Sequence, residues 1–347
     1  MALVTPPANR LLFGTTSYVL PADLLPNVRL LAPYVDDIEL ILFEGEESNL
    51  PTRVDVLELG KLAADGGCGF TVHLPLDVGI GELDAGARRR ARETCLRVIA
   101  LTLPLEPHAF VAHPELPLVY HPALGDDPDP LDELPADIHA AWQEALGESL
   151  GRLAAETGPF PLAVENLQFP YRWVRPLLEE HDLGVTMDVG HLLMHGGAVA
   201  SHLAEFGERL TVVHLHGIID GRDHREIGAF SCVELIDILA AVAAADSRRP
   251  AWAPAAAEAP ATGLQGAAPP PRSAPDPATR AGGTVVVSLE VFGWQPTVPS
   301  LRTLAALLAK PEAEAALGVP DCAALAARLG AAADAIMAAL PSFETAS

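Results

Sequence analysis

The chain has 347 residues, 50% of them hydrophobic, and its formal net charge at pH 7 is −24. An excess of acidic groups repels nucleic acid and anionic membranes, because both are bound by neutralising their phosphates with Lys and Arg. The four cysteines show no CxxC or other paired spacing, which is typical of reduced thiols in the cytoplasm. The N-terminal segment lacks a signal-peptide pattern, and no apolar run reaches the roughly 18 residues of a membrane span. We therefore expect a cytoplasmic protein that binds neither nucleic acid nor a membrane.

Segments typical of strands and of helices alternate along the chain. Short runs rich in Val, Leu and Ile predict eight strands, and a helix-like segment follows each of them. The predicted strands cover 11–17 and 38–44, end at His73, His113, Glu165, Asp188 and His214, and cover 284–290. The predicted helices cover about 22–31, 52–66, 84–101, 136–157, 171–181, 199–206, 232–245 and 300–309.

Eight βα units in succession predict one domain over 1–345, a single (β/α)8 TIM barrel of the α/β class. An open Rossmann-like sheet is the alternative, but it requires a GxGxxG turn where FGTTSYVLP has one glycine. Residues 248–282 are rich in Pro and Ala and poor in large apolar groups, so we expect a disordered insertion before the last strand. An Ala-rich helix at about 322–340 is expected on the barrel exterior.

The last four predicted strands each end on a residue of a type that commonly binds metal ions. Because the carboxyl ends of parallel barrel strands face one site, we expect these side chains to meet. Two glutamates, an aspartate and a histidine form a hard site for Zn, Mn, Fe, Co or Mg. Each residue alone could instead cap a helix or pair with an arginine. The four residues are Glu165, Asp188, His214 and Glu290.

Further histidines are expected at the same face. Two end predicted strands and two lie in the loops that follow later strands, and they are His73, His113, His191 and His224. These additional histidines favour a site for two or three metal ions. Ions that lie about 3.5–4 Å apart can clamp a phosphodiester and activate water. One ion with few histidines fits sugar isomerisation better. His216, two residues after His214, is a candidate partner for the ligands.

Other residues fall on this face if the barrel prediction is correct. They either contact a substrate or form turns and packing contacts, and they are Tyr18, Glu44, Gly79, Gly81, Trp173, Phe292 and Trp294. For three more histidines a structural role is expected, and these are His108, His121 and His195.

The order of these ligands resembles the xylose isomerase-like barrel superfamily, most of all its branch of type IV apurinic-site endonucleases. The resemblance implies three metal sites, with Glu165 bridging the first two. The implied ligands of the first ion are His73, His113 and Glu165, and those of the second are Glu165, Asp188, His214 and Glu290. The implied ligands of the third ion are His191, His224 and an aspartate. That branch has an aspartate two residues before the loop histidine, where this chain has Arg222. Asp220 or Asp223 is then the candidate for the third site.

A narrower resemblance lies in residues 14–78, which include TTSYVLPADLLPNVRLLAPYVDDIELILFE, SNLP and TVHLPLD. These segments are similar to cobamide-remodelling phosphodiesterases, which open the nucleotide loop of B12-type corrinoids. The resemblance implies a hydrolase with two or three divalent ions, Zn or Mn, a cobamide as substrate, and Glu165, Asp188 and Glu290 as catalytic residues.

Two other functions stay open. One is a sugar isomerase or epimerase that uses Glu165 and Glu290 as an acid–base pair on one metal. The other is a barrel that binds a corrinoid without catalysis. Neither the metal nor the oligomeric state follows from the sequence.

Overall fold

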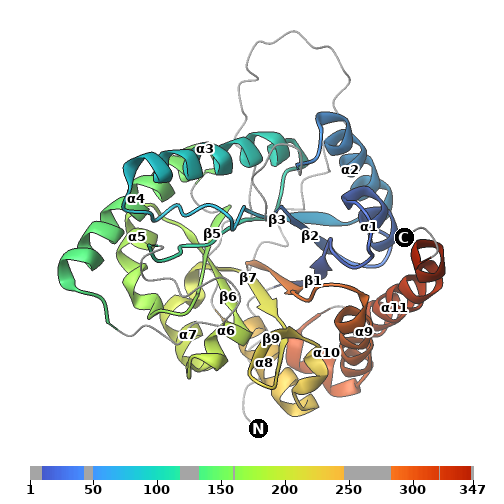
Figure 1. Ribbon diagram of the computed structural model, residues 1–347. Coiled ribbons are helices and arrows are strands. Elements are labelled where there is room, and N and C mark those ends of the chain that lie inside the picture. Colours follow the sequence, from blue (N-terminus) through green and yellow to red (C-terminus); the bar gives the residue numbers. More distant parts are fainter. Residues whose placement is uncertain are drawn as a thin grey trace.

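The computed structural model describes residues 10–42, 50–117, 133–158, 161–245, 283–319 and 321–344. Its parallel strands close into a barrel in the order β1-β10-β7-β6-β5-β4-β3-β2, and helices ring them (Figure 1). The pairing of β1 with β10 excludes an open sheet and confirms the TIM barrel. The barrel strands are β1 Arg10–Thr16, β2 Asp37–Ile41, β3 Gly69–His73, β4 Phe110–Ala112, β5 Leu162–Glu165, β6 Gly184–Asp188, β7 Leu210–Leu215 and β10 Thr284–Leu289.

Most outer helices lie close to their predicted positions. The helix predicted at 300–309 already begins at Trp294, and the one predicted at 171–181 is a 3-10 turn followed by a short helix. Two of the outer helices begin with capping boxes, Thr52 with Asp55 and Ser231 with Glu234, which satisfy backbone N–H groups at the helix start. The helices are α1 Leu24–Leu31, α2 Arg53–Gly66, α3 Ala85–Thr102, α4 Ala136–Thr157, α5 Arg175–Glu180, α7 Val199–Phe206, α8 Cys232–Ala244 and α9 Trp294–Leu308.

Besides short 3-10 turns, three features were not predicted. Two are short helices, α6 Val189–Met194 and α10 Pro311–Leu317. The third is a hairpin of β8 Gly217–Ile219 and β9 Arg222–Arg225, in a stretch read as a loop. Asp220 and Gly221 turn it with φ angles of 54° and 72°, as a two-residue hairpin turn with positive φ at both positions requires.

The barrel interior changes from apolar to polar toward the carboxyl ends of the strands. A small buried cluster, separate from the main core, lies inside the barrel and consists of Leu12, Ala109, Val111, Ala163, Val212 and Val286. Side chains two residues apart on a strand point the same way. Glu165, His214 and Ser288 therefore occupy the next interior layer, two residues beyond Ala163, Val212 and Val286.

The C-terminal helix α11, Cys322–Glu344, packs along α9. Among the described residues it is the one helix whose length and composition would allow a membrane span, a test that core helices of soluble proteins also pass. Arg328 of α11 donates to Asp36 at 2.7 Å, and Asp334 accepts from Arg302 of α9 at 3.2 Å. The buried side chains of Leu329, Ala333 and Ile336 hold α11 on the barrel exterior, where a helix was expected, and the two exposed ion pairs add little. The domain limits 1–345 remain a prediction, and the predicted insertion at 248–282 lies outside the described residues.

Candidate metal centre

The four predicted strand-end ligands meet at the carboxyl end of the barrel. Each of Glu165, Asp188, His214 and Glu290 offers a ligand atom, and these atoms lie within 4.8 Å of one another. Nδ1 of His214 is 3.0 Å from Oε2 of Glu290 and 3.3 Å from Oε1 of Glu165. All four side chains are buried, so the barrel holds them rigidly and away from solvent.

Two of the predicted shell histidines form a second cluster with Glu165. Nε2 of His73 and Nε2 of His113 lie 3.5 Å and 3.3 Å from Oε2 of Glu165. The other oxygen, Oε1, faces His214 at 3.3 Å. One carboxylate therefore reaches two ligand clusters through its two oxygens, which is the arrangement of a bridging ligand.

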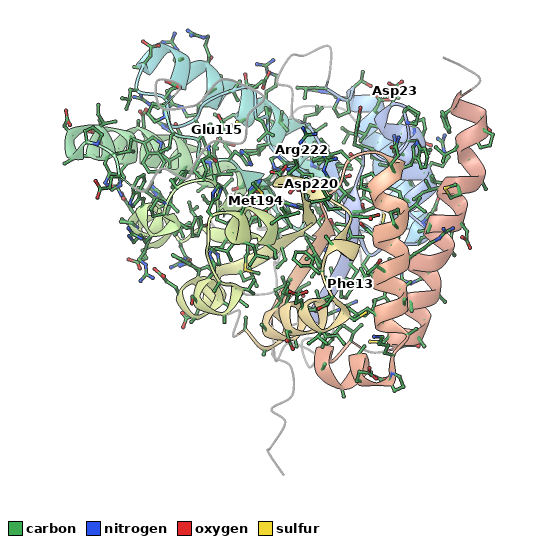
Figure 2. All side chains as sticks on the ribbon, turned by 60° about the horizontal axis from the view of Figure 1, so that its bottom comes forward. Phe13, Asp23, Glu115, Met194, Asp220 and Arg222 are labelled. Carbon is green, nitrogen blue, oxygen red and sulfur yellow. The ribbon has the colours of Figure 1, made fainter. Side chains whose placement is uncertain are left out.

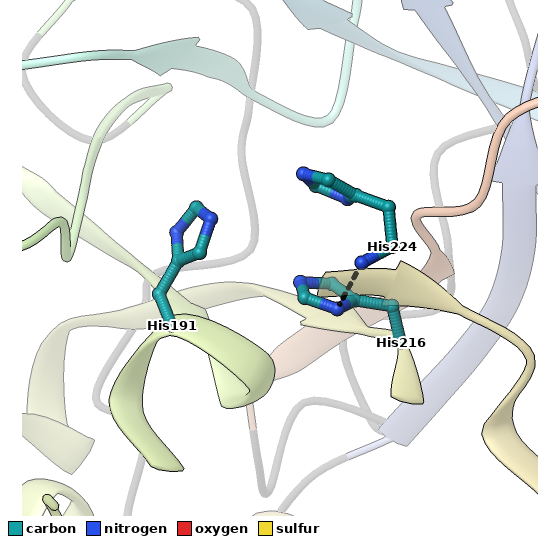
Figure 3. Close-up of side chains that lie close together, drawn as sticks. All are labelled: His191, His216 and His224. Atoms are coloured by element: carbon teal, nitrogen blue, oxygen red, sulfur yellow. Dashed lines mark hydrogen bonds between the residues drawn. The ribbon is translucent and has the colours of Figure 1, made fainter. Parts of the chain in front are cut away.

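A third cluster contains His191, His216 and His224 (Figure 3). The backbone N–H of His224 donates to Nδ1 of His216 at 2.9 Å, so Nδ1 carries no proton. Nε2–H of His216 then donates to Asp188, with distances of 3.0 and 3.1 Å to its two oxygens. Because both of its nitrogens are engaged, His216 positions Asp188 and the hairpin, in agreement with the predicted supporting role.

The hairpin decides which aspartate faces this cluster. Oδ2 of Asp223 is 3.3 Å from Nε2 of His191 and 3.7 Å from Nε2 of His224. Asp220 and Arg222 are exposed and lie together at the turn of the hairpin (Figure 2). Of the two candidate aspartates, Asp223 is therefore the one placed to join a third site.

Several buried donor and acceptor atoms at the centre make no well-directed hydrogen bond within the described part of the chain, although oppositely charged groups lie 3.0 to 3.5 Å from some of them. Each such atom costs about 1–3 kcal/mol if nothing satisfies it. Convergent unpaired oxygens and nitrogens without a thiolate suit divalent cations. The residues present therefore fit the expected metal ions. The atoms are Oε1 and Oε2 of Glu165, Nδ1 of His113, Nδ1 of His214 and Oε2 of Glu290.

The same residues are strongly coupled by charge. Burial raises the pKa of Glu165, but His214 and His113 outweigh burial and hold that pKa well below its ordinary range. Burial lowers the pKa of His113, and Glu165 reverses this and raises it to about 9. Asp188 likewise raises the pKa of His191 to about 10 against the effect of burial. With these raised pKa values, His113 and His191 are protonated at pH 7 when no cation is bound, so a cation that they bind must displace their protons.

Glu39 is a buried residue of the centre that the sequence patterns did not identify. Its Oε1 is 3.0 Å from Nε2 of His214, and its Oε2 accepts from Ser288 at 2.8 Å. This contact fixes the His214 ring with Nδ1 toward Glu165 and Glu290. The sequence patterns indicate Glu44 instead, which lies outside the described residues. The available signal was an ionisable residue in the middle of the apolar strand β2.

Of the remaining candidates, Phe292 contacts a residue of the centre, whereas Tyr18 lines a separate cavity. Tyr18 is 56% exposed and lines a cavity of about 600 Å³ beside the ends of β1 and β2. Phe292 packs against the His224 ring with centroids 4.9 Å apart. Trp294 opens α9 and is half-buried.

Other candidates are structural. Trp173 is buried and stacks on Phe169 with centroids 5.8 Å apart. At Gly81 a Cβ would approach Nε1 of Trp142 to 2.6 Å and the backbone oxygen of Glu115 to 2.8 Å, so this glycine serves close packing. At Gly79 a Cβ would meet only the flexible side chain of Glu82, at 2.8 Å from its Cγ.

Comparison with known proteins places the chain in a family. A family model described as a xylose isomerase-like TIM barrel matches residues 35–248. No curated protein matches the chain. Three similar solved structures are a D-tagatose 3-epimerase-like protein, a D-psicose 3-epimerase from Clostridium cellulolyticum H10 and a D-allulose 3-epimerase from Methylomonas sp..

Their identities to this chain are 17%, 15% and 16%, with TM-scores of 0.54, 0.52 and 0.53. The alignments cover 86%, 95% and 96% of this chain and 97%, 99% and 99% of those chains. At such low sequence identities the structural similarity shows the fold alone. The family is shown by the family model, which matches more than half of the chain. The chain belongs to the xylose isomerase-like TIM barrel family.

Proposed function

We propose that the protein is a metal-dependent phosphodiesterase. The observation that carries the proposal is the bridging position of Glu165 between two ligand clusters, with a third cluster beside them. A site for one ion needs only the four strand-end ligands. The added imidazoles of His73 and His113 supply a second site on the same carboxylate, and paired or triple ions suit phosphodiester hydrolysis.

Bound divalent ions would polarise the phosphate oxygens and lower the pKa of a water molecule that attacks phosphorus. The chain supplies a rigid frame for this chemistry. Asn166 accepts from the backbone N–H of Asp188 at 2.8 Å and donates to its carbonyl at 3.0 Å. His216 holds the Asp188 carboxylate, and Glu39 holds His214. The ligand directions are therefore set before substrate binds, which is what electrostatic stabilisation of phosphoryl transfer requires.

For the substrate we propose a cobamide, whose nucleotide-loop phosphodiester would be hydrolysed. Water adds across one P–O bond and yields a corrinoid phosphate and the riboside of the lower ligand. Support comes from the resemblance of residues 14–78 to cobamide-remodelling phosphodiesterases. The net charge of −24 argues against a nucleic-acid substrate. The cavity beside Tyr18 is lined largely by the resembling segment, after the ends of β1 and β2.

A sugar isomerase or epimerase is the second candidate. Several of the similar solved structures are sugar 3-epimerases, and this comparison favours the second candidate over the first. Glu165 and Glu290 both contact His214, as an acid–base pair on one metal would. This function leaves no chemical task for His73, His113 and the third cluster.

Product analysis separates these functions. The protein, loaded with Zn or Mn, is incubated separately with several cobamides, an abasic-site oligonucleotide and a panel of ketohexoses. A corrinoid phosphate detected by mass spectrometry supports the proposal. Cleavage of the oligonucleotide would refute the cobamide as substrate but support the phosphodiesterase function. An epimerised sugar with intact cobamides refutes the phosphodiesterase.

A further inference from the structure

A second cavity adjoins the metal centre on the side of β5 and β6. It has a volume of about 320 Å³ and lies between the segment after β5 and helices α6 and α7. Asn166 and His191 line it, and both also belong to the metal centre, where they contact Asp188. A molecule in this cavity therefore has one end at the metal ligands.

The cavity has aromatic walls. Phe169, Tyr171 and Phe206 all line it. The hydroxyl of Tyr171 already donates to the carbonyl of Val164 at 2.7 Å, so its ring is the part left for a ligand. On the outer side Arg175 lies over the Phe206 ring, 5.1 Å from its centroid. Such walls favour flat rings.

His202 adds a polar side chain to this aromatic wall. Its ring lies 5.1 Å from the rings of both Tyr171 and Phe206, and only 6% of the residue is exposed. Nε2 of His202 has no hydrogen-bond partner in the described ranges. Burial lowers the pKa of His202 to about 4, so the imidazole is neutral at pH 7. An unpartnered buried imidazole destabilises a fold, and because His202 lines the cavity, a ligand bound there can satisfy its Nε2.

We propose that this cavity binds the smaller half of the diester, a neutral fused heteroaromatic ring carried on a pentose, with His202 hydrogen-bonded to the ligand. The assignment rests on the proposed phosphodiesterase function, because the cavity ends at the metal ligands. Its volume is at the small end of the range of about 300–1,000 Å³ for ligand pockets. It suits a bicyclic ring with a sugar and is far too small for a corrin macrocycle, which must lie elsewhere over the barrel mouth.

Calorimetric titration of the Zn-loaded full chain with benzimidazole riboside tests the assignment, with free ribose and base-free cobinamide as comparison ligands. Ser201→Phe places a ring in the cavity and should weaken riboside binding at least about tenfold. Ala204→Phe is the matched control, because Ala204 is an exposed residue of the same helix that does not line the cavity. It should bind within about twofold of the unaltered chain.

His202→Phe gives a second readout that does not depend on Ser201. It keeps the ring volume and removes the unpartnered nitrogen, so the melting temperature of the ligand-free chain should not fall. Riboside binding should nevertheless weaken about three- to tenfold. A purely structural histidine would show the opposite pattern, with lower stability and unchanged binding.

The outcomes separate the cavity from the proposed function. Equal riboside affinity in the unaltered chain, Ser201→Phe and His202→Phe overturns the cavity assignment even if cobamides are hydrolysed. The expected affinity pattern without hydrolysis of any phosphodiester supports the cavity and refutes the function. Tight binding of free ribose, or loss of riboside binding in Ala204→Phe, also overturns the assignment.

Discussion

Strand β2 contributes a buried carboxylate to each end of the barrel, and the two have different surroundings. Asp37 lies near the amino end, where its Oδ2 is 2.6 Å from Nδ1 of the partly exposed His108. Glu39, two residues later, contacts His214, and from there the contacts continue to Glu165 and Glu290. A buried acid–imidazole contact is therefore no mark of function by itself. What distinguishes the carboxyl end is the convergence of ligands from several strands.

The largest expected difference is between Glu165→Gln and Asp37→Asn. Glu165→Gln keeps the side-chain shape but removes the charge shared by two ligand clusters, so hydrolysis should fall at least about 10³-fold. Asp37→Asn should leave kcat and KM almost unchanged and lower the free energy of unfolding by about 1–3 kcal/mol. Steady-state kinetics and urea denaturation measure both effects. Equal losses of activity in two folded variants would remove the distinction between the ends.

Glu39→Gln should have the next largest effect. The amide cannot hold the Nε2–H of His214 as a carboxylate does, and loss of such a partner costs about 10- to 100-fold in metal affinity. Competition against a chromophoric chelator measures this affinity. Ser288→Ala is the graded control: it removes one contact of Glu39 and leaves the contact with His214, so its effect should be smaller. An unchanged affinity in Glu39→Gln would make Glu39 an ordinary core residue like Asp37.

Gly190→Ala tests the support given by His216. A Cβ at Gly190 would lie 2.0 Å from Cε1 of the His216 ring, so the ring must move away from Asp188. We expect a loss of about tenfold in metal affinity, typical of disturbed supporting contacts. Gly228→Ala is the matched control, because its added Cβ meets Oγ1 of Thr303 at an ordinary 3.6 Å. Equal affinities in the two variants would show that His216 does not support Asp188.

A smaller effect is expected from pH. His113 and His191 have raised pKa values of about 9 and about 10, so a metal ion must displace their protons at neutral pH. Metal affinity should therefore rise as the pH increases from 6 toward 9, with protons released on binding. The stability that these imidazoles give the metal-free chain is fully present below their ordinary pKa near 6.5. It should be lost as the pH rises through 9 to 10. Calorimetry in buffers of different ionisation enthalpy measures the protons, and no release would contradict the assignment.

The barrel and most of the centre follow from local patterns. Alternating apolar runs and helix signals predict the eight units, and strand order then brings Glu165, Asp188, His214 and Glu290 together because parallel strands end at one face. Glu39 was not predicted, because it lies within a strand and its contact with His214 forms only when the barrel closes.

The third cluster was predicted in part. Asp220–Gly221 is a hairpin signal, yet the short strands on either side carry little apolar pattern. Without the hairpin, the choice between Asp220 and Asp223 was open. The contact of His216 with the backbone of His224 depends on the same turn.

Metal content per chain tests the central claim most directly. The protein is saturated with Zn or Mn, freed of loosely bound ions by gel filtration and examined by elemental analysis against protein concentration. Two clusters that share Glu165, and a third cluster beside them, predict two or three ions per chain. A value near one ion per chain, unchanged in a His73→Ala variant, would contradict the account and favour a single-metal isomerase.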